Sequence, residues 1–479
     1  MSALLVWVIF PGLVATALFF FRSNRRIVTY VGTIVALGLA WVAWQVPIGE
    51  AFSFGPIGLI ISESFSVLGR EFSFSDLERP FLAFLYLSTA LWLFGSYYAR
   101  PSDSFVPVAL AIVSLLTAAL AVEPFLFAAL LIEIAVLISI PLLAPHRKPA
   151  GRGVFRFIAF QTFGMPFILF AGWMLAGVGA SPSDLELVVR ASALLALGFA
   201  FLLAVFPFHT WIPMLAREVH PYVAAFLFFI LPFVISIFAL GFLDRFVWLR
   251  ESESVYLLLR SVGIVMVVVG GLWAAFETHL GKILGFAAVM EIGLSLAAIG
   301  LGSSAGISLY FSLVLPRLIS FLIWAIALAF IYRGTRENLS FSAVKGLGLQ
   351  YPFIVFSLIA AQLSLAGIPL FAGFPPRLVL WRELMQVSSP LVFGALLGNM
   401  AFLVSSVRTL LVLMKSGEKN EFYIGTPDEK TFSVPTESVA AFSLILFSLA
   451  VGLLLLVGLF PQWFLPAIDA LPMMFEHIG

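Results

Sequence analysis

Long apolar runs separated by short polar connections make up almost all of this 479-residue chain. A transmembrane helix needs about 20 apolar residues. About fourteen runs of that length recur, near residues 2–21, 27–46, 80–99, 104–122, 124–144, 155–178, 191–208, 221–243, 256–276, 283–301, 306–331, 352–374, 389–414 and 437–460. The pattern predicts an all-α polytopic membrane protein of about fourteen transmembrane helices, with no segment long enough for a soluble domain.

Composition agrees with this class and narrows the chemistry. The chain is 62% hydrophobic and 11% charged, whereas soluble domains carry about 25% charged residues, so we expect lipid against much of its surface. The absence of cysteine excludes disulfides and thiolate-bound iron–sulfur clusters in this chain. A net charge of +1 does not support nucleic-acid binding. No metal-ligand spacing or phosphate loop occurs, so we expect no cofactor, no metal and no redox or hydrolytic chemistry here.

The distribution of Lys and Arg predicts an orientation. The first apolar run is followed by arginines and lacks a basic segment before it, so we expect a retained span and not a signal peptide. Of the 26 Lys and Arg, sixteen fall in the loops of one side, seven in those of the other, and three within spans. Because cytoplasmic loops are enriched in these residues, we expect both termini on the outer side.

Two predicted spans contain helix breaks. The first break covers 206–213, at the end of the seventh span, and the second covers 365–376, in the twelfth. Proline removes a backbone donor, and broken backbone at membrane depth survives only where protein or a wet cavity surrounds it. The two breaks lie five spans apart, which predicts an inverted repeat of the kind found in carriers, although prolines also kink inert helices. The breaking residues are Pro207, Pro213, Gly367, Pro369, Pro375 and Pro376.

Glu133 is the clearest ionisable group inside a span. About eight apolar residues flank it on either side, so it cannot reach the membrane surface and must be protonated or paired. An ionisable residue in a span is a functional hypothesis by default. We interpret Glu133 as a proton relay, with a purely structural pair as the alternative. Glu123, beside Pro124 at a helix end, fits a simple interfacial role.

Five further groups are candidates for a proton pathway or for structural roles. Arg377 follows the second break, where it could fix a carboxylate or backbone carbonyls but could not pass on a proton. Arg317 and Glu291 could pair or be steps on a polar axis, and Arg408 lies within the thirteenth span. His209, in the first break, titrates in the range that proton transfer needs, or it is a hydrogen-bonding group at a helix end.

Several motifs resemble those of one family. The segment 206–213, Phe-Pro-Phe-His-Thr-Trp-Ile-Pro, resembles the P-F-H-x-W-x-P signature of the antiporter-like subunits of respiratory complex I, which are related to Mrp-type sodium/proton antiporter subunits. Residues 363–377 resemble the family's L-S-L-A-G-I-P-x-x-A-G-F-x-x-K segment. Residues 282–293 and 223–227 are similar to its K-R-L-L-A-Y-S-S-I-x-H-I-G and V-T-A-F-L motifs. The chain is thereby identified as a divergent member of this family.

The resemblance implies a single antiporter-like membrane domain of fourteen helices with two inverted five-helix repeats, each carrying a proton half-channel. On that plan the N-terminal helices occupy 1–103, the first repeat 104–243, the second repeat 256–414 and a C-terminal helix 437–479. Glu133 matches the family's essential glutamate on the fifth helix. Arg377 stands at its lysine on the twelfth helix, and Arg408 resembles its arginine on the thirteenth.

The chain departs from the family at several pathway positions. Leu202 stands where the family has a lysine on the seventh helix, and Pro232 where it has one on the eighth. Glu291 replaces a histidine on the tenth helix, and the lysine of the eleventh falls near Ile319, two residues from Arg317. Leucine and proline cannot carry a proton, and arginine does not release one.

The resemblance implies a membrane-arm subunit of a complex I-like assembly in a bacterial-type inner membrane. Such a chain contributes to proton translocation coupled to quinone reduction, as a non-redox subunit of an NADH (or other donor):quinone oxidoreductase with other membrane subunits as partners. The lost lysines favour degenerate or rerouted conduction, whereas Glu133, His209 and the two breaks favour a surviving path. The alternatives are a non-conducting scaffold in the same assembly, an Mrp-type cation/proton antiporter subunit, or a bicarbonate-uptake or hydrogenase relative.

Overall fold

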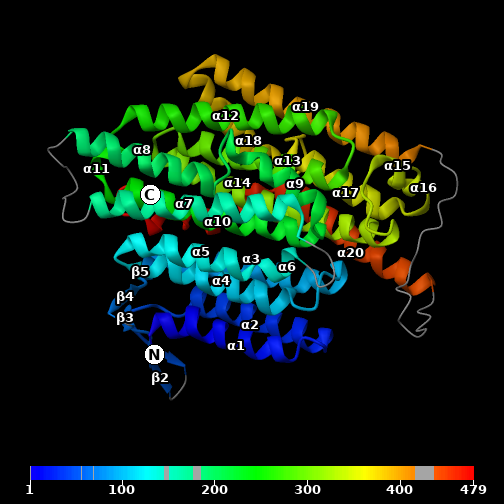
Figure 1. Ribbon diagram of the computed structural model, residues 1–479. Coiled ribbons are helices and arrows are strands. Elements are labelled where there is room, and N and C mark those ends of the chain that lie inside the picture. The colour runs from blue at the N-terminus through cyan, green and yellow to red at the C-terminus, as the bar shows by residue number, and fades with distance from the viewer. Residues whose placement is uncertain are drawn as a thin grey trace.

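Helices lying side by side dominate the computed structural model, which describes residues 2–54, 57–67, 69–144, 150–175, 185–415 and 436–478 (Figure 1). The longer helices are α1 (Phe10–Phe20), α2 (Arg25–Gln45), α3 (Arg79–Ala99), α4 (Phe105–Ala121), α5 (Ala128–Ile138), α7 (Arg152–Met174), α8 (Leu185–Leu202), α9 (Trp211–Glu218), α10 (Pro221–Arg245), α12 (Glu253–Phe276), α13 (Leu280–Ile299), α14 (Ser304–Gly334), α17 (Pro352–Leu365), α18 (Phe374–Val387), α19 (Ser389–Met414) and α20 (Thr436–Leu459).

Short helical turns connect or extend these helices. They are η1 (Leu5–Ile9), η2 (Asp76–Glu78), η3 (Phe125–Phe127), α6 (Ile140–Leu143), η4 (Phe208–Thr210), α11 (Val247–Arg250), α15 (Phe341–Val344), α16 (Leu347–Gln350), η5 (Pro461–Trp463), α21 (Leu465–Asp469) and η6 (Pro472–Met474).

Short strands occupy the connection between the second and third helices, where the apolar pattern predicts no regular structure. β1 (Ala51–Phe54) and β2 (Ile57–Ile60) form an antiparallel hairpin with Ala51 opposite Ile60. β3 (Ser64–Val67), β4 (Arg70–Ser73) and β5 (Val122–Glu123) form a second antiparallel sheet. The all-α prediction therefore holds for the bundle but is wrong for residues 51–73, since strands this short carry too few alternations to show in the sequence.

Local signals account for several helix ends. The Asn24 side chain accepts a hydrogen bond from the backbone N–H of Ile27 at 3.4 Å and begins α2. Proline occupies the first turn of α3, α10, α17, α18 and α19, where its missing N–H costs no helical hydrogen bond. At the other end of α3, Arg100 adopts the left-handed conformation, with φ of 50°, and closes the helix.

Within the described residues, nine helices are long and apolar enough to cross a membrane, or ten if the bent pair of 341–350 and 352–365 is counted as one span. The two parts of that pair meet at 116°. Helical segments occur at the places of the predicted apolar runs. Several of these segments are too short to be counted as membrane spans by length alone; examples are α1, α4, and α17 and α18 on either side of the second break. The chain is thus a polytopic helical protein suited to a membrane.

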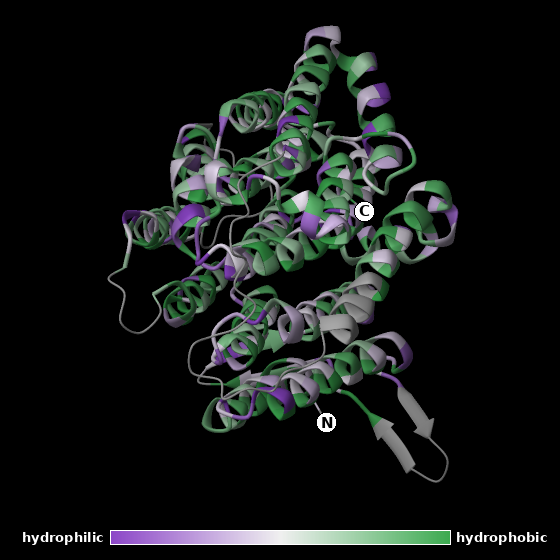
Figure 2. Cartoon of the chain, turned by 90° about the vertical axis from the view of Figure 1, so that its right-hand side faces the viewer, coloured by the Kyte–Doolittle hydropathy of each residue, from purple (hydrophilic) through white to green (hydrophobic). Residues whose placement is uncertain are grey.

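The bundle has buried central helices and apolar outward faces. In Figure 1, α1 to α4 lie on one side, α12 and α19 on the opposite side, and α10 and α14 between them. α10, α13 and α14 are buried along almost all of their length, whereas α7 and α12 expose much of theirs. In the view along the helices, hydrophobic residues (green) lie around the outside of the bundle (Figure 2). Because these faces include large exposed side chains such as Phe20 and Trp173, they suit contact with lipid or with other apolar helices.

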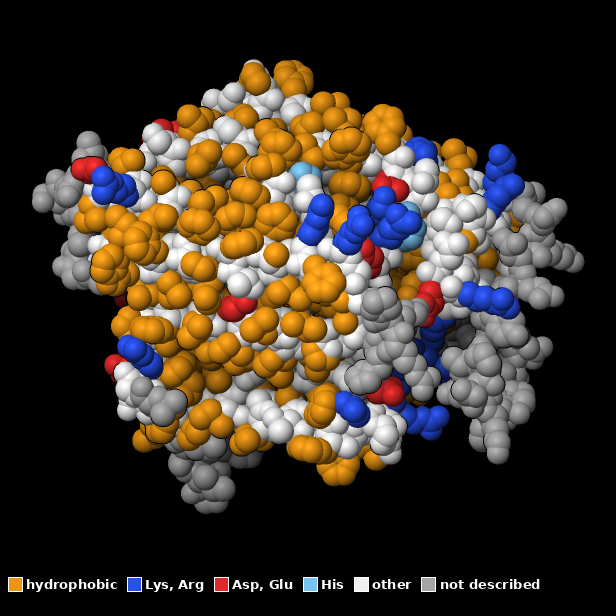
Figure 3. Space-filling model, viewed as in Figure 1, with side chains coloured by type: hydrophobic (Ala, Val, Ile, Leu, Met, Phe, Trp, Pro, Cys, Tyr) orange, Lys and Arg blue, Asp and Glu red, His pale blue; other side chains and the backbone are white. Residues whose placement is uncertain are grey.

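The charged residues lie mainly at the ends of the helices. Both chain termini lie at the same end of the bundle in Figure 1. On the face in Figure 3, Lys and Arg gather towards the opposite end. This separation agrees with the sequence count, although Arg147, Lys148, Lys419 and Lys430 lie outside the described residues.

Glycines allow α12 and α13 to pack closely. A Cβ on Gly293 of α13 would lie 2.6 Å from the Gly263 carbonyl oxygen and 2.8 Å from the Met266 Cβ. Small residues at such contacts let helix backbones approach, which is the main source of packing energy between membrane helices. This contact sets the position of α13, and with it that of Glu291.

We expect Gly293→Val to lower the free energy of unfolding by about 1–3 kcal/mol, because the added atoms overlap the α12 backbone. The measurement is the apparent Tm of the detergent-solubilised chain. Gly38→Val on α2 is the matched control, since a Cβ there meets no atom within 4 Å. Equal Tm values for the two variants would contradict the packing argument.

Candidate functional site

The second helix break positions an arginine inside the bundle. α17 ends at Leu365, and the chain turns through Gly367, whose φ is 74°, before α18 begins at Phe374. A Cβ on Gly367 would lie 2.7 Å from the Arg377 Cδ, so the turn admits no side chain there. Arg377, in the first turn of α18, donates from Nη1 to the Gly373 carbonyl oxygen at 2.9 Å. The start of α18 therefore supplies an acceptor to a side chain that is 1% exposed.

Glu291 joins Arg377 and Arg317 in one buried ion cluster. Arg377 donates from Nη2 to the Glu291 Oε1, and Arg317 donates from Nε to the Glu291 Oε2 at 3.1 Å. Arg317 Nη2 also donates to the Glu291 carbonyl oxygen at 2.7 Å and to the Ser295 Oγ at 2.6 Å. The Glu291 and Arg377 side chains are 1% exposed and that of Arg317 is 3% exposed. The three residues come from α13, α14 and α18, so the cluster joins three helices.

The cluster carries a fixed charge. Guanidinium groups stay protonated in proteins, and each oxygen of the Glu291 carboxylate accepts a hydrogen bond from one of them. Two positive groups and one negative group leave a net charge of +1 in the interior. Within the described residues, Arg377 Nε is buried and has no hydrogen-bond partner. The sequence left open whether Arg317 and Glu291 pair; the structure pairs them and adds Arg377.

Glu133 lies elsewhere and has a different environment. It is 8% exposed on α5, and its Oε1 accepts a hydrogen bond from the Thr162 Oγ1 of α7 at 2.6 Å. Among the described residues no Lys, Arg or His lies within ion-pair distance of it. A single neutral hydroxyl compensates a buried carboxylate only in part, whereas the Glu291 carboxylate is held between two arginines.

The first helix break holds His209 in a buried turn. α8 ends at Leu202, Ala204 has a φ of 52°, and the short helix η4 carries His209 into α9. The His209 side chain is 7% exposed and its ring stacks on that of Phe206, with 5.6 Å between centroids. In the described part of the chain its Nδ1 has no hydrogen-bond partner. The structure therefore leaves both interpretations of His209, proton transfer and hydrogen bonding at a helix end, as predictions.

Leu202 and Pro232 stand where the resembling family has lysines. They line the same small cavity, about the size of one water molecule. Gln161 and Trp211 also line it. Gln161 donates from Nε2 to the Leu202 carbonyl oxygen at 3.0 Å, while its Oε1 and the Trp211 Nε1 are buried with no partner among the described residues. Buried polar atoms of this kind are usually satisfied by ordered water. Beside the two positions where the family has lysines, the cavity thus holds an amide and an indole.

The sequence of this chain is similar to those of known membrane proteins. Residues 183–403, which include both breaks, match the family model described as NADH:quinone oxidoreductase/Mrp antiporter, TM. NADH-quinone oxidoreductase subunit N of Cytophaga hutchinsonii is 26% identical over 276 residues, 56% of each chain. NADH-quinone oxidoreductase subunit N 2 of Solidesulfovibrio magneticus is 31% identical over 258 residues, 50% of this chain and 53% of that one. The chain is related to these antiporter-like membrane subunits.

Solved structures extend the similarity to the whole fold. A chain of the Mrp complex from Dietzia sp. matches with a TM-score of 0.79 and 18% identity, over 99% of this chain and 97% of that one. A chain of respiratory complex I from Thermus thermophilus matches with a TM-score of 0.76 and 19% identity, over 99% and 98%. At 18–19% identity these matches establish the fold of this chain and not its function. In sequence, it spans about half the length of the curated relatives it matches.

Arg408 and Glu123, which the sequence analysis singled out, lie apart from both the Glu291 cluster and Glu133. Arg408 on α19 donates from Nη1 to the Ala275 carbonyl oxygen, near the end of α12, and it contacts no residue of the Glu291 cluster in the described hydrogen bonds. Glu123 pairs with Arg245 at the end of α10, where both side chains are more than one-third exposed. The geometry of Glu123 fits the interfacial role expected for it.

Several polar residues of the site escaped the sequence analysis. Thr162, Gln161 and Ser295 make the contacts described above, and the Ser320 Oγ donates to the Ser364 Oγ at 2.9 Å beside the second break. Gln362 and Asn399 are fully buried, with amide atoms that have no partner among the described residues. Isolated polar residues inside apolar spans are the signal that could have found them. Within the described residues, no group of three or more His, Cys, Asp or Glu could hold a metal ion.

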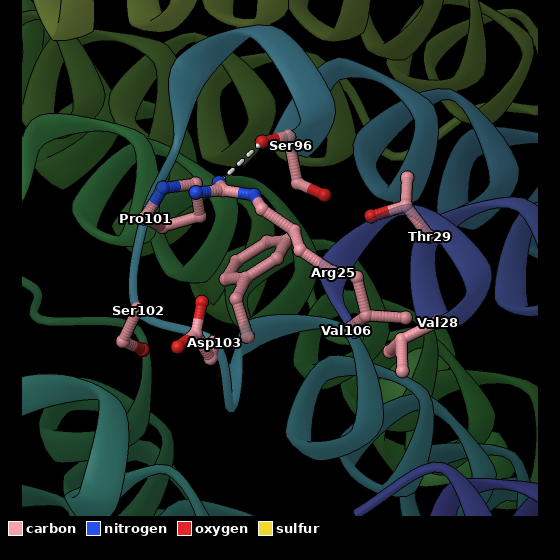
Figure 4. A pocket seen from close by; sticks show the side chains of 9 residues that line it. Arg25, Val28, Thr29, Ser96, Pro101, Ser102, Asp103 and Val106 are labelled. Atoms are coloured by element: carbon pink, nitrogen blue, oxygen red, sulfur yellow. Dashed lines mark hydrogen bonds between the residues drawn. The ribbon is translucent and has the colours of Figure 1, made fainter. Parts of the chain in front are cut away.

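A small pocket at one end of the helices is lined by Arg25 of α2, Ser96 of α3, Asp103 and the start of α4 (Figure 4). Arg25 donates from Nη2 to the Ser96 carbonyl oxygen at 2.9 Å. Outside the pocket, Arg333 of α14 donates to the carbonyl oxygen of Tyr98, near the same end of α3, at 3.1 Å. Cations at a helix C-terminus satisfy its last carbonyls and oppose its dipole. The two arginines therefore join α2 and α14 to the end of α3.

We expect acid to destabilise the antiporter-like chain through His220, which lies just before α10. Burial, together with the charges of Arg333 and Arg25, lowers the pKa of His220 to about 3, against about 6.5 for an unfolded histidine. The unfolded chain binds the extra proton between these values, so stability falls as the pH falls from about 6.5 to about 3. Burial and Arg217 lower the pKa of His279 to about 4, which adds to the same slope.

The measurement is the apparent Tm of the solubilised chain between pH 7 and about 4. The Tyr222 N–H donates to the His220 Nδ1 at 3.3 Å. His220→Asn removes the titrating imidazole but keeps an acceptor for this N–H. We expect a shallower decline in Tm than in the wild type. His477→Asn, at a half-exposed position, is the control and should leave the slope unchanged. Identical slopes for His220→Asn and the wild type would refute the assignment.

Proposed function

We propose that this chain is a membrane-arm subunit of a complex I-like assembly, where it contributes to proton translocation coupled to quinone reduction. The observation that carries the proposal is the match of residues 183–403 to the NADH:quinone oxidoreductase/Mrp antiporter family. That region contains both helix breaks and the buried Glu291 cluster. The curated relatives compared above are named as subunits of NADH-quinone oxidoreductase.

The proposed architecture has fourteen spans, with inverted five-helix repeats at about 104–243 and 256–414. Two features support it. Each proposed repeat contains one broken helix, and each break is followed by a short helix, α9 or α18, that packs back into the bundle. Each repeat also has a buried glutamate, Glu133 in the first and Glu291 in the second.

In this proposal Glu133 is the residue that takes up and releases the proton. Its carboxylate is buried among apolar side chains and touches one neutral hydroxyl, that of Thr162, so either protonation state can be accommodated. Because Leu202 and Pro232 replace the expected lysines, a proton leaving Glu133 needs another carrier. We propose that a water in the cavity beside Gln161, the chain neighbour of Thr162, is that carrier.

A second candidate function is a non-conducting scaffold that fills an antiporter position in the same assembly. The observation that favours it is the apolar lining of the cavity at Leu202 and Pro232, since leucine and proline carry no proton. In either case we expect other membrane subunits as partners. The solved structures with this fold come from complexes, including an Mrp complex and a membrane-bound sulfane sulfur reductase. We also expect both termini on the outer side of the membrane.

We expect Glu133→Gln to abolish the proton translocation that depends on this chain. The amide keeps the shape and can still bond to Thr162, but it cannot take up a proton. The measurement is donor-driven acidification of inverted membrane vesicles that contain the whole assembly, with the amount of assembled complex checked on a native gel.

Glu186→Gln is the matched control for this test. Glu186 pairs with Arg190 on the exposed surface of α8, so this variant should translocate protons as the wild type does. Thr162→Val should lower translocation partially, because it removes the one hydrogen bond to Glu133 and not the carboxylate. Full translocation by Glu133→Gln would exclude the proton-carrying role and favour the scaffold.

We expect the chain to co-purify with other membrane subunits when it carries an affinity tag at its native expression level. Peripheral flavin and iron–sulfur subunits in the purified material would support an oxidoreductase assembly. Several small membrane subunits without redox partners would instead indicate an Mrp-type antiporter. A stable chain that purifies alone and translocates protons would contradict both assemblies.

A further inference from the structure

Helix α2 separates its small and large side chains onto opposite faces. The inward face carries Gly32, Ala36, Ala40 and Ala43, all buried, and a Cβ on Gly32 would lie 2.7 Å from the Val106 Cγ1 of α4. Small residues mark the faces on which membrane helices pack against one another. Large side chains lie on the opposite face, which we call the exposed face of α2. They are 44–66% exposed and include Ile27, Tyr30, Ile34, Leu37, Trp41 and Trp44, with Gly38 as the one small residue among them.

Arginines stand at one end of the exposed face of α2. Arg22, in the turn before α2, and Arg26, in its first turn, are both exposed, and the Arg22 guanidinium lies over the Phe19 ring, 4.3 Å from its centroid. Residues 1–49 contain no Asp or Glu, and among the described residues neither of these two arginines forms an ion pair. Arg25, by contrast, turns inward and donates to the Ser96 carbonyl oxygen. Two guanidinium groups therefore remain available to an anion from outside the chain.

Tryptophans stand at the other end of the exposed face of α2. Trp41 and Trp44 lie in its last turns, which Arg79 closes by donating to the carbonyl oxygens of Ala43 at 3.1 Å and Trp44 at 2.8 Å. Tryptophan is enriched where a membrane meets water. From Arg26 to Trp44 the helix rises about 27 Å, close to the roughly 30 Å of a hydrocarbon core. The face thus has the length of a membrane core and groups suited to the interface at both ends.

A phospholipid fits the exposed face of α2 better than another helix does. Helices need small residues to approach one another in a membrane, and α2 presents those inward, to α3 and α4. A phosphate matches the guanidinium fork, and acyl chains cover large apolar side chains without close backbone contact. A headgroup with its own ammonium group would place a cation beside the two arginines, so their charge favours an anionic headgroup.

We propose that the exposed face of α2 binds an anionic phospholipid, with Arg22 and Arg26 holding the phosphate and the acyl chains lying along the helix towards Trp41. α1 and α2 form one edge of the bundle (Figure 1), so this edge faces lipid and not another subunit. The proposal concerns a binding surface and does not depend on proton translocation by this chain.

The first test identifies what lies on the exposed face of α2 in the native membrane. The photo-crosslinking residue p-benzoylphenylalanine replaces Ile34, which is 66% exposed, and the assembled complex is irradiated before the chain is purified. We expect the mass of the chain to rise by that of one phospholipid. The same residue in place of Asn338, in the exposed connection after α14, is the control and should give no lipid adduct. A product that carries another subunit, or no lipid adduct at residue 34, would overturn the proposal.

The second test measures the preference for an anionic headgroup. The assembled complex with the crosslinker at residue 34 is reconstituted into vesicles of equal amounts of phosphatidylglycerol and phosphatidylethanolamine. We expect several times more phosphatidylglycerol adduct than phosphatidylethanolamine adduct, and a ratio near one for the double variant Arg22→Gln, Arg26→Gln. A ratio near one in the wild type, or an unchanged ratio in the double variant, would refute the phosphate site.

The double variant Arg152→Gln, Arg156→Gln is the matched control, because it removes the same charge from exposed arginines at the start of α7. It should keep the wild-type ratio. An equal fall in both double variants would mean that general surface charge recruits the lipid, and the proposal would then fail. None of these substitutions alters Glu133, so loss of the proposed proton translocation and loss of the lipid site are separate results.

Discussion

A charge buried away from water must be compensated by other groups of the protein, at a cost of several kcal/mol if it is not. In this chain the second helix break helps to meet that requirement. The break places Arg377 in the first turn of α18, where its guanidinium donates to the Gly373 carbonyl oxygen and to Glu291. Arg317 supplies the second donor from α14. The central helices are therefore joined by ionic hydrogen bonds that lipid could not replace.

Close backbone contacts make this arrangement possible. Gly293 lies two residues from Glu291 on α13 and lets α12 approach to within contact of the α13 backbone. Membrane helices gain little from the hydrophobic effect when they associate, so such contacts carry much of the packing energy. The cluster and the glycine contact lie within one turn of α13. One helix thus carries both the electrostatic and the steric constraints on the second half of the bundle.

The sequence predicted the helical membrane class, the places of most helices, both breaks and the family resemblance, because apolar runs and proline motifs are local signals. It did not predict strands in residues 51–73, which are too short for a clear alternation. It offered a pair of Arg317 and Glu291 as one of two interpretations but did not bring Arg377 to them, since the three residues lie on three helices. Thr162 was missed for the same reason. Its role follows from its hydrogen bond to Glu133, a residue on another helix, and the sequence does not show that contact.

The two buried glutamates have different surroundings. Glu133 accepts one hydrogen bond, from the neutral hydroxyl of Thr162, whereas Glu291 lies between two guanidinium groups. Burial without an opposite charge disfavours the charged form of a carboxylate, and neighbouring cations favour it. The two proposed repeats therefore need not be two similar halves, because the partners of each buried charge decide what that charge can do.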